Sequence, residues 1–97
     1  MSVKWTHEAL ANLDKAVKFI AEDKPIAAAN VARKIWNVSQ LLAEQPGMGR
    51  IGRVSGTREL VVPDLPFILP YVEKDGMVII LRVMHTSMKW PKSFPTK

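Results

Sequence analysis

Two amphipathic helical segments meet at Pro25, and this arrangement limits the fold more than any other feature of the chain. Apolar residues recur at helical spacing in both segments: Leu10, Leu13, Val17 and Ile20, then Ala28, Val31, Ile35, Val38 and Leu42. Thr6 is a predicted N-cap for the first helix, and Pro46-Gly47 is expected to end the second. Pro25 disfavours helical geometry at Lys24 and suits the first turn of the helix that follows. Because about two residues join the helices, they are predicted to form an antiparallel hairpin.

The rest of the chain has the alternation and the turn signals of β-structure. Strands are predicted at 57–62, 67–74 and 77–85, after a short strand at 3–5, and residues 47–56, with four glycines and two arginines, are predicted to form a loop. Asp75-Gly76 is a strong hairpin signal between the last two strands. Residues 77–85 are apolar on both faces, which indicates an interior strand. Pro70 would remove a ladder N–H from a central strand, so it predicts either a bulge or a locally unpaired stretch.

These elements predict an α+β domain in the order β-α-α-β-β-β. An antiparallel helical hairpin would pack on a mainly antiparallel sheet, in a single domain over residues 1–97 with a mobile tail at about 91–97. In such a sheet the strands 57–62 and 77–85 run in the same sense, on either side of 67–74. The start of the first and the end of the second therefore lie at opposite ends of the sheet, so the pattern does not place Arg58 beside His85.

Charge and composition exclude several classes of protein. The formal net charge is +5, with six Lys and Arg against five Asp and Glu in residues 1–45 and eight against four in residues 46–97. The basic second half is either a solvated surface or a face for an anionic partner. The absence of cysteine excludes disulfides, and no apolar run reaches the roughly 18–20 residues of a membrane span. With no signal-peptide pattern either, we expect a cytoplasmic protein without a membrane partner.

No cofactor or metal is expected. Residues 47–52, GMGRIG, match the glycine pattern of a dinucleotide-binding loop, but a helix precedes them and a strand follows, which is the reverse of what that site needs. The two histidines, His7 and His85, are far apart and have no cysteine to complete a metal site. Ser87 lies near His85, but no nucleophile elbow surrounds it, so a serine hydrolase is poorly supported.

The arginines of the second half are the more informative residues. Arg50, Arg53 and Arg58 cluster around the glycine-rich loop and the strand after it. Taken singly, each is explained as well by a bond to a carbonyl or by a pair with Glu59 or Asp64. As a set they predict a surface that binds phosphate or carboxylate, because arginine binds both groups bidentately. Arg50 and Arg53 could approach His85 only through the path of the loop.

The ordered set of residues along the chain resembles the RelE/ParE superfamily of type II toxins from bacterial toxin–antitoxin pairs. The matching residues are Trp5, EAL at 8–10, Leu13, Pro46, Gly49, Arg50, GTREL at 56–60, Tyr71, Ile80-Leu81, Val83, His85 and Trp90-Pro91. The resemblance implies a small cytosolic toxin that a cognate antitoxin neutralises by wrapping its C-terminal segment around it. RelE-like members are ribosome-dependent messenger-RNA endonucleases, whereas ParE-like members poison DNA gyrase. The resemblance also makes His85 and Trp90-Pro91 a structural end-piece, in which Trp90 covers the edge of the core.

If the chain were a nuclease of this kind, the resemblance would assign the chemistry to five residues. These candidates are Arg58, Tyr71, Arg82, His85 and Lys89, which could supply a base, an acid and cations for the developing charge. RelE-like nucleases commonly carry an arginine three residues before the tyrosine, where this chain has Ile68. Many carry another just after the last strand, where this chain has residues 86–88, TSM.

We therefore predict the gyrase-directed branch, and whether the chain is an enzyme stays open. The residues expected to contact the target are Arg50, Arg53, Arg58, His85, Lys89 and Trp90. A ribosome-dependent messenger-RNA endonuclease is the alternative function, and a non-toxic protein-interaction domain is the second alternative.

Overall fold

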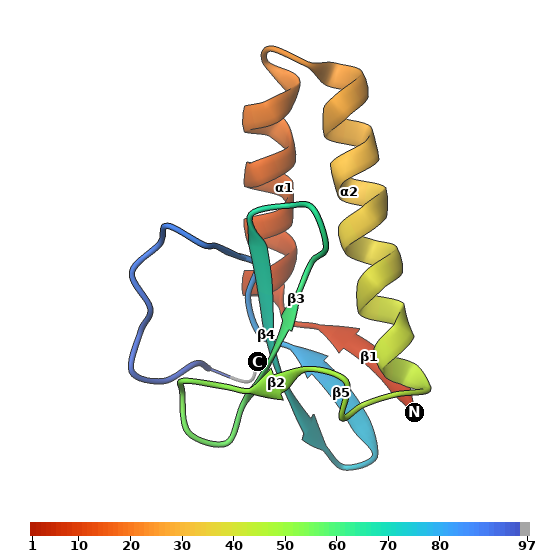
Figure 1. Cartoon of the computed structure of the whole chain (residues 1–97), viewed down its shortest axis with the longest axis vertical. Coiled ribbons are helices and arrows are strands. Elements are labelled where there is room, and N and C mark those ends of the chain that lie inside the picture. Colours follow the sequence, from red (N-terminus) through yellow and green to blue (C-terminus); the bar gives the residue numbers. More distant parts are fainter. Residues whose placement is uncertain (96–97) are drawn as a thin grey trace.

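A helical hairpin lies against one face of a six-stranded mixed sheet (Figure 1). The computed structural model describes residues 1–95, so two residues of the tail predicted to be mobile, 96–97, lie outside the described residues. The elements are β1 (Ser2–Trp5), α1 (His7–Ala21), α2 (Pro25–Gln40), the 3-10 turn η1 (Leu41–Ala43), β2 (Arg50–Ile51), β3 (Arg58–Val61), β4 (Phe67–Lys74), β5 (Met77–Ile80) and β6 (Met84–His85). The predicted α+β class and the hairpin-on-sheet architecture are confirmed.

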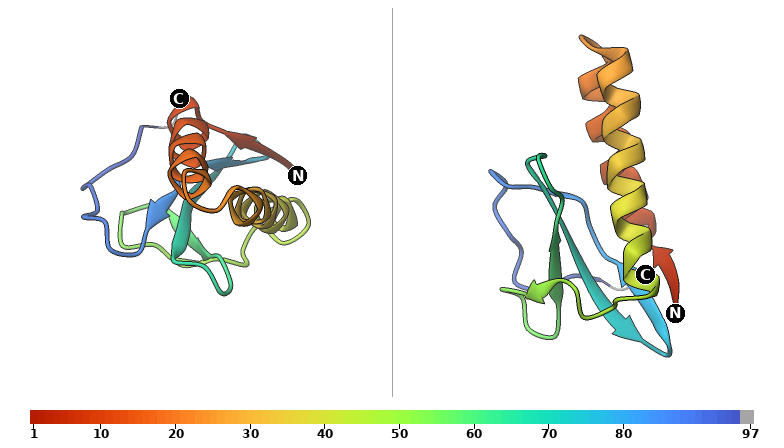
Figure 2. Two further views of the ribbon diagram at one scale, coloured as in Figure 1. Left: turned by 90° about the horizontal axis from the view of Figure 1, so that it is seen from above. Right: turned by 45° about the vertical axis from the view of Figure 1, so that its right-hand side comes forward.

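The helices begin where capping chemistry predicts. The Thr6 hydroxyl accepts a hydrogen bond from the Ala9 N–H at 3.0 Å, which caps α1, and donates to the Leu81 carbonyl at 2.9 Å, which ties the cap to the sheet. Pro25 is the first residue of α2, as expected from its fixed φ. The antiparallel helices extend beyond the sheet at the end of the hairpin where α1 leads into α2 (Figures 1 and 2).

The strand order across the sheet is β1-β5-β4-β3-β2, and β6 pairs with β4 beyond the end of β5. β1 runs parallel to β5, and every other pair is antiparallel. Asp75 and Gly76 both have positive φ, at 53° and 75°, as a two-residue turn of type I′ requires between β4 and β5. β5 is therefore an interior strand, flanked by β1 and β4, as its apolar sequence predicted.

The core fills the space between the hairpin and the helix-facing side of the sheet. Its fully buried members include Ile35, Leu42, Leu69, Tyr71 and Ile80, which come from α2, η1, β4 and β5. The predicted stripe of α2 packs here through Val31, Ile35 and Val38. In α1 the predicted stripe was partly wrong, because Leu13 packs on the cluster with Ala9 and Ala16, whereas Leu10 is 44% exposed.

Two sequence expectations about the strands were wrong in detail. The predicted loop 47–56 contains the two-residue strand β2, which pairs with β3 through Arg50 opposite Glu59. The predicted strand 77–85 is divided into β5 and β6, with residues 81–83 between them.

Pro70 in β4 accounts for this division. The Val62 N–H donates to the Phe67 carbonyl, and antiparallel alternation from that pair makes Glu59 opposite Pro70 a non-hydrogen-bonded pair. The side of Pro70 that lacks an N–H therefore faces away from β3, toward the gap between β5 and β6. There the Leu81 N–H donates to the Pro70 carbonyl at 2.9 Å, and regular pairing resumes at Met84 opposite Ile68. Between Leu81 and Met84, residues 82 and 83 lie opposite Leu69 alone, and one extra residue on one strand is a β-bulge. Of the two sequence alternatives, the bulge is the one observed.

Asn12 of α1 satisfies the backbone at this gap. Its side-chain oxygen accepts from the Val83 N–H at 3.1 Å and from Arg82 Nε at 2.8 Å. Asn12→Ala is expected to lower the free energy of unfolding by about 1–2 kcal/mol, because the Val83 N–H loses its acceptor in a part-buried site. Urea denaturation of the purified protein measures the loss. Asn12→Asp, which keeps an acceptor oxygen, should lose much less, and equal losses in both variants would contradict this role.

Candidate functional site

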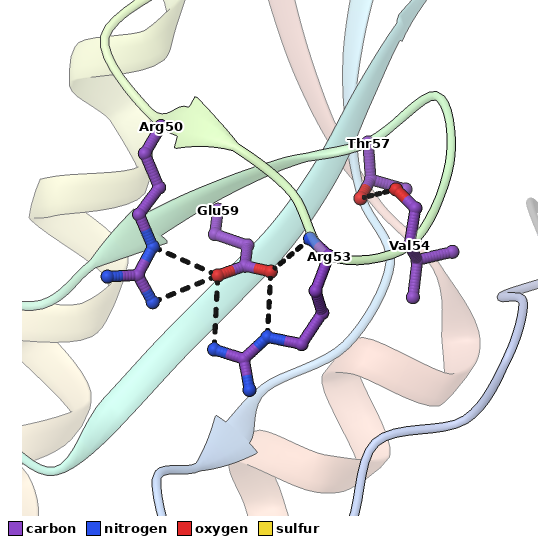
Figure 3. A network of polar contacts seen from close by, with 5 residues as sticks. All are labelled: Arg50, Arg53, Val54, Thr57 and Glu59. Atoms are coloured by element: carbon purple, nitrogen blue, oxygen red, sulfur yellow. Dashed lines mark hydrogen bonds and ion pairs between the residues drawn. The ribbon is translucent and has the colours of Figure 1, made fainter.

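A buried carboxylate organises the arginine-rich end of the sheet. Glu59 of β3 is 2% exposed, and its carboxylate accepts hydrogen bonds from Arg50 and Arg53 (Figure 3). Arg50 approaches Glu59 Oε1 through Nε at 3.0 Å and through a terminal nitrogen at 2.9 Å. Arg53 donates to Oε2 from its backbone N–H at 2.8 Å and from Nε at 3.1 Å, and to Oε1 from a terminal nitrogen at 3.3 Å. We call these three residues the Glu59 cluster.

The cluster keeps Glu59 ionised in spite of its burial. Burial by itself raises the pKa of the Glu59 carboxyl, but the backbone and side-chain hydrogen bonds from Arg53 and the side-chain bond from Arg50 outweigh it. The pKa of Glu59 therefore lies below its ordinary value. With two arginines on one carboxylate the cluster carries one net positive charge, and both guanidinium groups remain about half exposed.

Tyr71 of β4 is a second organising residue, and it is wholly buried. Its hydroxyl donates to the Pro46 carbonyl at 2.7 Å and accepts from the Gly49 N–H at 2.9 Å. Burial raises the pKa of the Tyr71 hydroxyl above its ordinary value. Glycine is required at position 49, because a Cβ there would lie 2.7 Å from the Tyr71 ring and 2.8 Å from the Glu59 carbonyl oxygen.

Arg58 holds the same loop from the adjacent strand. It lies opposite Tyr71 in the β3–β4 register and donates from one terminal nitrogen to the Gly49 carbonyl at 2.8 Å and to the Gly47 carbonyl at 3.5 Å. Arg58 and Tyr71, with Gly56, Val72 and Glu73, line a shallow surface hollow of about 210 Å³. Tyr71 and Arg58 thus bind both the N–H and the carbonyl of Gly49.

The residues at the end of the last strand form a separate group. Arg82 is held by Asn12 and approaches Glu8 at 3.7 Å, so it faces α1. His85 Nδ1 accepts from the Ser87 N–H at 3.1 Å and lies 2.7 Å from the Ser87 hydroxyl, which places the proton of a neutral ring on Nε2. The His85 ring also meets Phe67 edge-on, with 5.5 Å between ring centroids. The Lys89 side chain is exposed.

The five residues of the conditional nuclease site do not converge. Arg58 pairs with Tyr71, whereas His85 pairs with Phe67, four positions earlier in β4, or roughly 13 Å away at the usual rise per residue. This confirms the expectation that Arg58 and His85 lie at opposite ends of the sheet. The recorded partners of the Arg50 and Arg53 side chains are Glu59 and, for Arg53, Trp90.

Trp90 is brought to the Glu59 cluster by the path of the C-terminal segment. The guanidinium carbon of Arg53 lies 3.9 Å from the centroid of the Trp90 ring, and Trp90 in turn meets Phe94 edge-on at 5.9 Å. Two residues predicted to contact the target, Arg53 and Trp90, are therefore in direct contact with each other. Within residues 1–95 no group of three or more potential metal ligands occurs, and no helix is long and apolar enough to cross a membrane.

Sequence reasoning named the arginines of the loop but missed the residues that organise them. Glu59 entered only as one possible ion-pair partner, although it is the one acidic residue between Pro46 and Pro63 in a strongly basic stretch. Asn12 had no local signal, since its partners lie about seventy positions later in the chain. Asp64 pairs with Lys34 of α2 at 3.3 Å, and not with an arginine of the loop.

Comparisons with known proteins all find toxins or toxin–antitoxin systems. A family model described as "ParE toxin of type II toxin-antitoxin system, parDE" matches residues 3–90. "Putative toxin Y4kP" of Sinorhizobium fredii is 45% identical over 91 residues, with 93% of each chain covered. "Toxin RelE2" of Caulobacter vibrioides is 34% identical over 85 residues, which cover 88% of this chain and 94% of the relative. A solved structure described as "Chromosomal ParDE TA system from P. aeruginosa" superposes with a TM-score of 0.81 at 31% identity, covering 88% of this chain and 95% of that one.

Proposed function

The chain belongs to the ParE toxin family of type II toxin–antitoxin systems, and on that basis we propose that it stops growth by inhibiting DNA gyrase. Gyrase inhibition is the activity that the resemblance to ParE-like toxins implies. In this proposal the protein acts by binding its target and supplies no acid–base chemistry of its own.

The burial of Tyr71 carries the choice of this branch. A general acid or base must come within hydrogen-bond reach of the reacting group. The Tyr71 hydroxyl is instead engaged by the Pro46 carbonyl and the Gly49 N–H, and the residue is buried although it borders the hollow beside Arg58. Arg58 donates to loop carbonyls in the same region. These contacts give both residues a structural role and support a toxin without a nuclease centre.

The two branches are separated by parallel assays on the purified protein. The proposal expects loss of gyrase supercoiling, with accumulation of the gyrase–DNA cleavage complex, and no site-specific cleavage of message on translating ribosomes. The alternative endonuclease, which the name of the Caulobacter relative suggests, predicts the reverse. Message cleavage in the ribosomal decoding site with gyrase unaffected would refute the proposed target.

Histidine replacement gives an independent check on the absence of catalysis. His85→Ala is expected to weaken inhibition by less than about ten-fold, the size of one lost target contact, because the ring accepts from the Ser87 N–H and meets Phe67 and transfers no proton. Loss of a general acid or base would cost about 10²–10⁴ in rate. The amount of induced toxin needed to arrest growth, at matched expression, measures the effect for either target. His7→Ala, at the exposed start of α1, is the matched control. A hundred-fold loss in His85→Ala alone would support the nuclease.

A cognate antitoxin is the partner of a ParE-family toxin, and we propose that it covers the hairpin and the free edge of the sheet. Phe19 and Ile26, at the end where α1 leads into α2, are 75% and 79% exposed, an unusual state for large apolar side chains. β2 pairs with β3 only at Arg58 and Glu59, so Val61, two positions beyond Glu59 on β3, lies past this pairing and is half exposed. An amphipathic helix or an added strand fits these features.

Truncation of the antitoxin tests this placement. Removal of the C-terminal half of the antitoxin is expected to abolish co-purification of the two proteins, because that half would supply the apolar contacts to the toxin. The full-length antitoxin is the control, and size-exclusion chromatography of the co-expressed pair provides the measurement. A stable complex after truncation would count against a wrapping antitoxin.

A further inference from the structure

We propose that residues 89–95 form a detachable arm that leaves the body of the protein when one stack, Trp90 on Arg53, is broken, and that the free arm binds a partner protein through Trp90 and Phe94. The partner is taken to be the target of the toxin, so this part of the inference rests on the proposed function. The detachment itself depends only on contacts within the chain.

The arm is held by the partial burial of Trp90, Pro91 and Phe94 and by ring contacts, without hydrogen bonds. The last backbone hydrogen bonds before it run from the Thr86 N–H to the Pro66 carbonyl and from the Met88 N–H to the His85 carbonyl. Within the described part of the chain, residues 89–95 make no hydrogen bond and no ion pair, and their recorded ring contacts are the Arg53–Trp90 stack and the Trp90–Phe94 pair. The C-terminal segment curves away from the body on the side opposite α2 (Figures 1 and 2), and Trp90 meets Arg53 in the loop that follows β2.

The docking surface does not need the arm in order to form. Glu59 holds Arg53 through its backbone N–H, its Nε and a terminal nitrogen, so the guanidinium group stays in place when Trp90 leaves (Figure 3). Docking also has a cost, because Trp90 Nε1 is buried without an acceptor. A cation–π contact and an unsatisfied N–H are of similar size and opposite sign, so these two terms nearly cancel. What remains to favour the docked state is the partial burial of Trp90, Pro91 and Phe94. A segment attached in this way opens locally while the rest of the fold persists.

The sequence of the arm suits it to a protein partner. Trp90 and Phe94 are each followed by proline, at positions 91 and 95, and this restrains both aromatic residues to extended backbone geometry. The free arm is thus an extended peptide with two rings four positions apart and with the exposed Lys89 and Lys92 beside them. Buried aromatic side chains dominate many protein interfaces, and lysines favour an acidic surround. The partner surface it fits has apolar pockets bordered by acidic side chains.

Fluorine NMR of the full chain labelled with 5-fluorotryptophan tests the detachment. The chain has three tryptophans, and Trp90→Phe identifies the Trp90 resonance. We expect that resonance to be broadened by exchange in the unsubstituted protein and to move to a single free position in Arg53→Gln. Arg50→Gln is the matched control, since Arg50 shares Glu59 but does not contact Trp90. Unchanged Trp5 and Trp36 resonances report an intact fold. A sharp Trp90 resonance that Arg53→Gln leaves in place would overturn the detachable arm.

Growth arrest after induced expression tests the binding role. Trp90→Ala with Phe94→Ala is expected to require at least about ten-fold more toxin for the same arrest, with antitoxin co-purification unchanged, because the lost rings act as interface anchors. Ser93→Ala, an exposed position between them, is the control. Full arrest by the double variant at matched expression would overturn the binding role. Growth arrest can be measured whatever the target of the toxin is. If the unsubstituted toxin arrests growth while gyrase is unaffected, the proposed target is refuted, but the double variant still tests whether the arm binds a partner.

Discussion

Glu59→Gln is expected to lower the free energy of unfolding by about 2–4 kcal/mol. The carboxylate is buried and accepts from two guanidinium groups and from the Arg53 N–H. Glutamine has one acceptor oxygen and would turn its NH2 group toward one of these donors. Loss of a buried charge that several donors surround costs about this much, reduced here because both arginines are half exposed and can be hydrated. Urea denaturation at neutral pH measures the loss.

The control for this variant is Glu73→Gln, an exposed glutamate on the neighbouring strand β4, which should change stability by less than about 0.5 kcal/mol. A loss of that small size in Glu59→Gln itself would show that the cluster is an ordinary surface ion pair. Because Trp90 stacks on Arg53, the same variant should shift the Trp90 resonance toward its position in the free arm.

The pH dependence of the same pair of proteins gives a second signature. The pKa of Glu59 is lowered in the folded state, so its contribution to stability is fully present above the ordinary value of 4.5. That contribution is lost as the pH falls from about there through the lower folded-state pKa. The stability difference between the unsubstituted protein and Glu59→Gln should therefore be constant near neutral pH and shrink in acid. A difference that grows on acidification would contradict the lowered pKa.

Sequence patterns predicted correctly those helices and turns that are determined by residues close together in the chain. The hairpin followed from apolar spacing and from Pro25, and the β4–β5 turn followed from Asp75-Gly76, whose positive φ angles are what that dipeptide favours. The two errors about the strands were non-local. β2 is only two residues long and depends on pairing with Arg58 and Glu59 of β3, seven and nine positions later. The division between β5 and β6 is caused by Pro70 on the neighbouring strand, and its effect on residues 81–83 depends on register.

In the candidate site, too, features set by neighbouring residues were predicted and features set by strand pairing were not. The composition of the loop identified Arg50, Arg53 and Arg58 as a group, because clustering along the chain is visible in sequence. Their partners were not visible, since a cross-strand neighbour is fixed by strand register and not by charge. The alternatives that sequence kept open for the arginines, a carbonyl or a glutamate partner, are the contacts that the structure contains. Their role toward a target stays a prediction.

Tyr71→Phe should separate structure from catalysis more sharply than any other substitution. It deletes only the hydroxyl, which leaves the buried Gly49 N–H without an acceptor and the Pro46 carbonyl without a donor. The expected loss is about 2–3 kcal/mol in the free energy of unfolding, measured by urea denaturation. Inhibition of the target at a temperature where the variant remains folded should stay within about three-fold of the unsubstituted protein. A catalytic hydroxyl would instead give about 10²–10⁴ loss of activity with little loss of stability.

Arg58→Met completes this test, because Arg58 holds the carbonyl of the same Gly49 whose N–H is bound to Tyr71. If the two side chains together hold the loop 46–49, either substitution alone already frees the loop. The second substitution then removes less stabilisation than it would in the unsubstituted protein. The double variant should therefore lose less stability than the sum of the single losses, with a coupling of about 0.5–3 kcal/mol. Additive losses would mean that each side chain stabilises its own surroundings independently. In that case the buried tyrosine would be a core residue with a satisfied hydroxyl, and the loop that carries Arg50 toward Glu59 would have to be positioned by the Glu59 cluster alone.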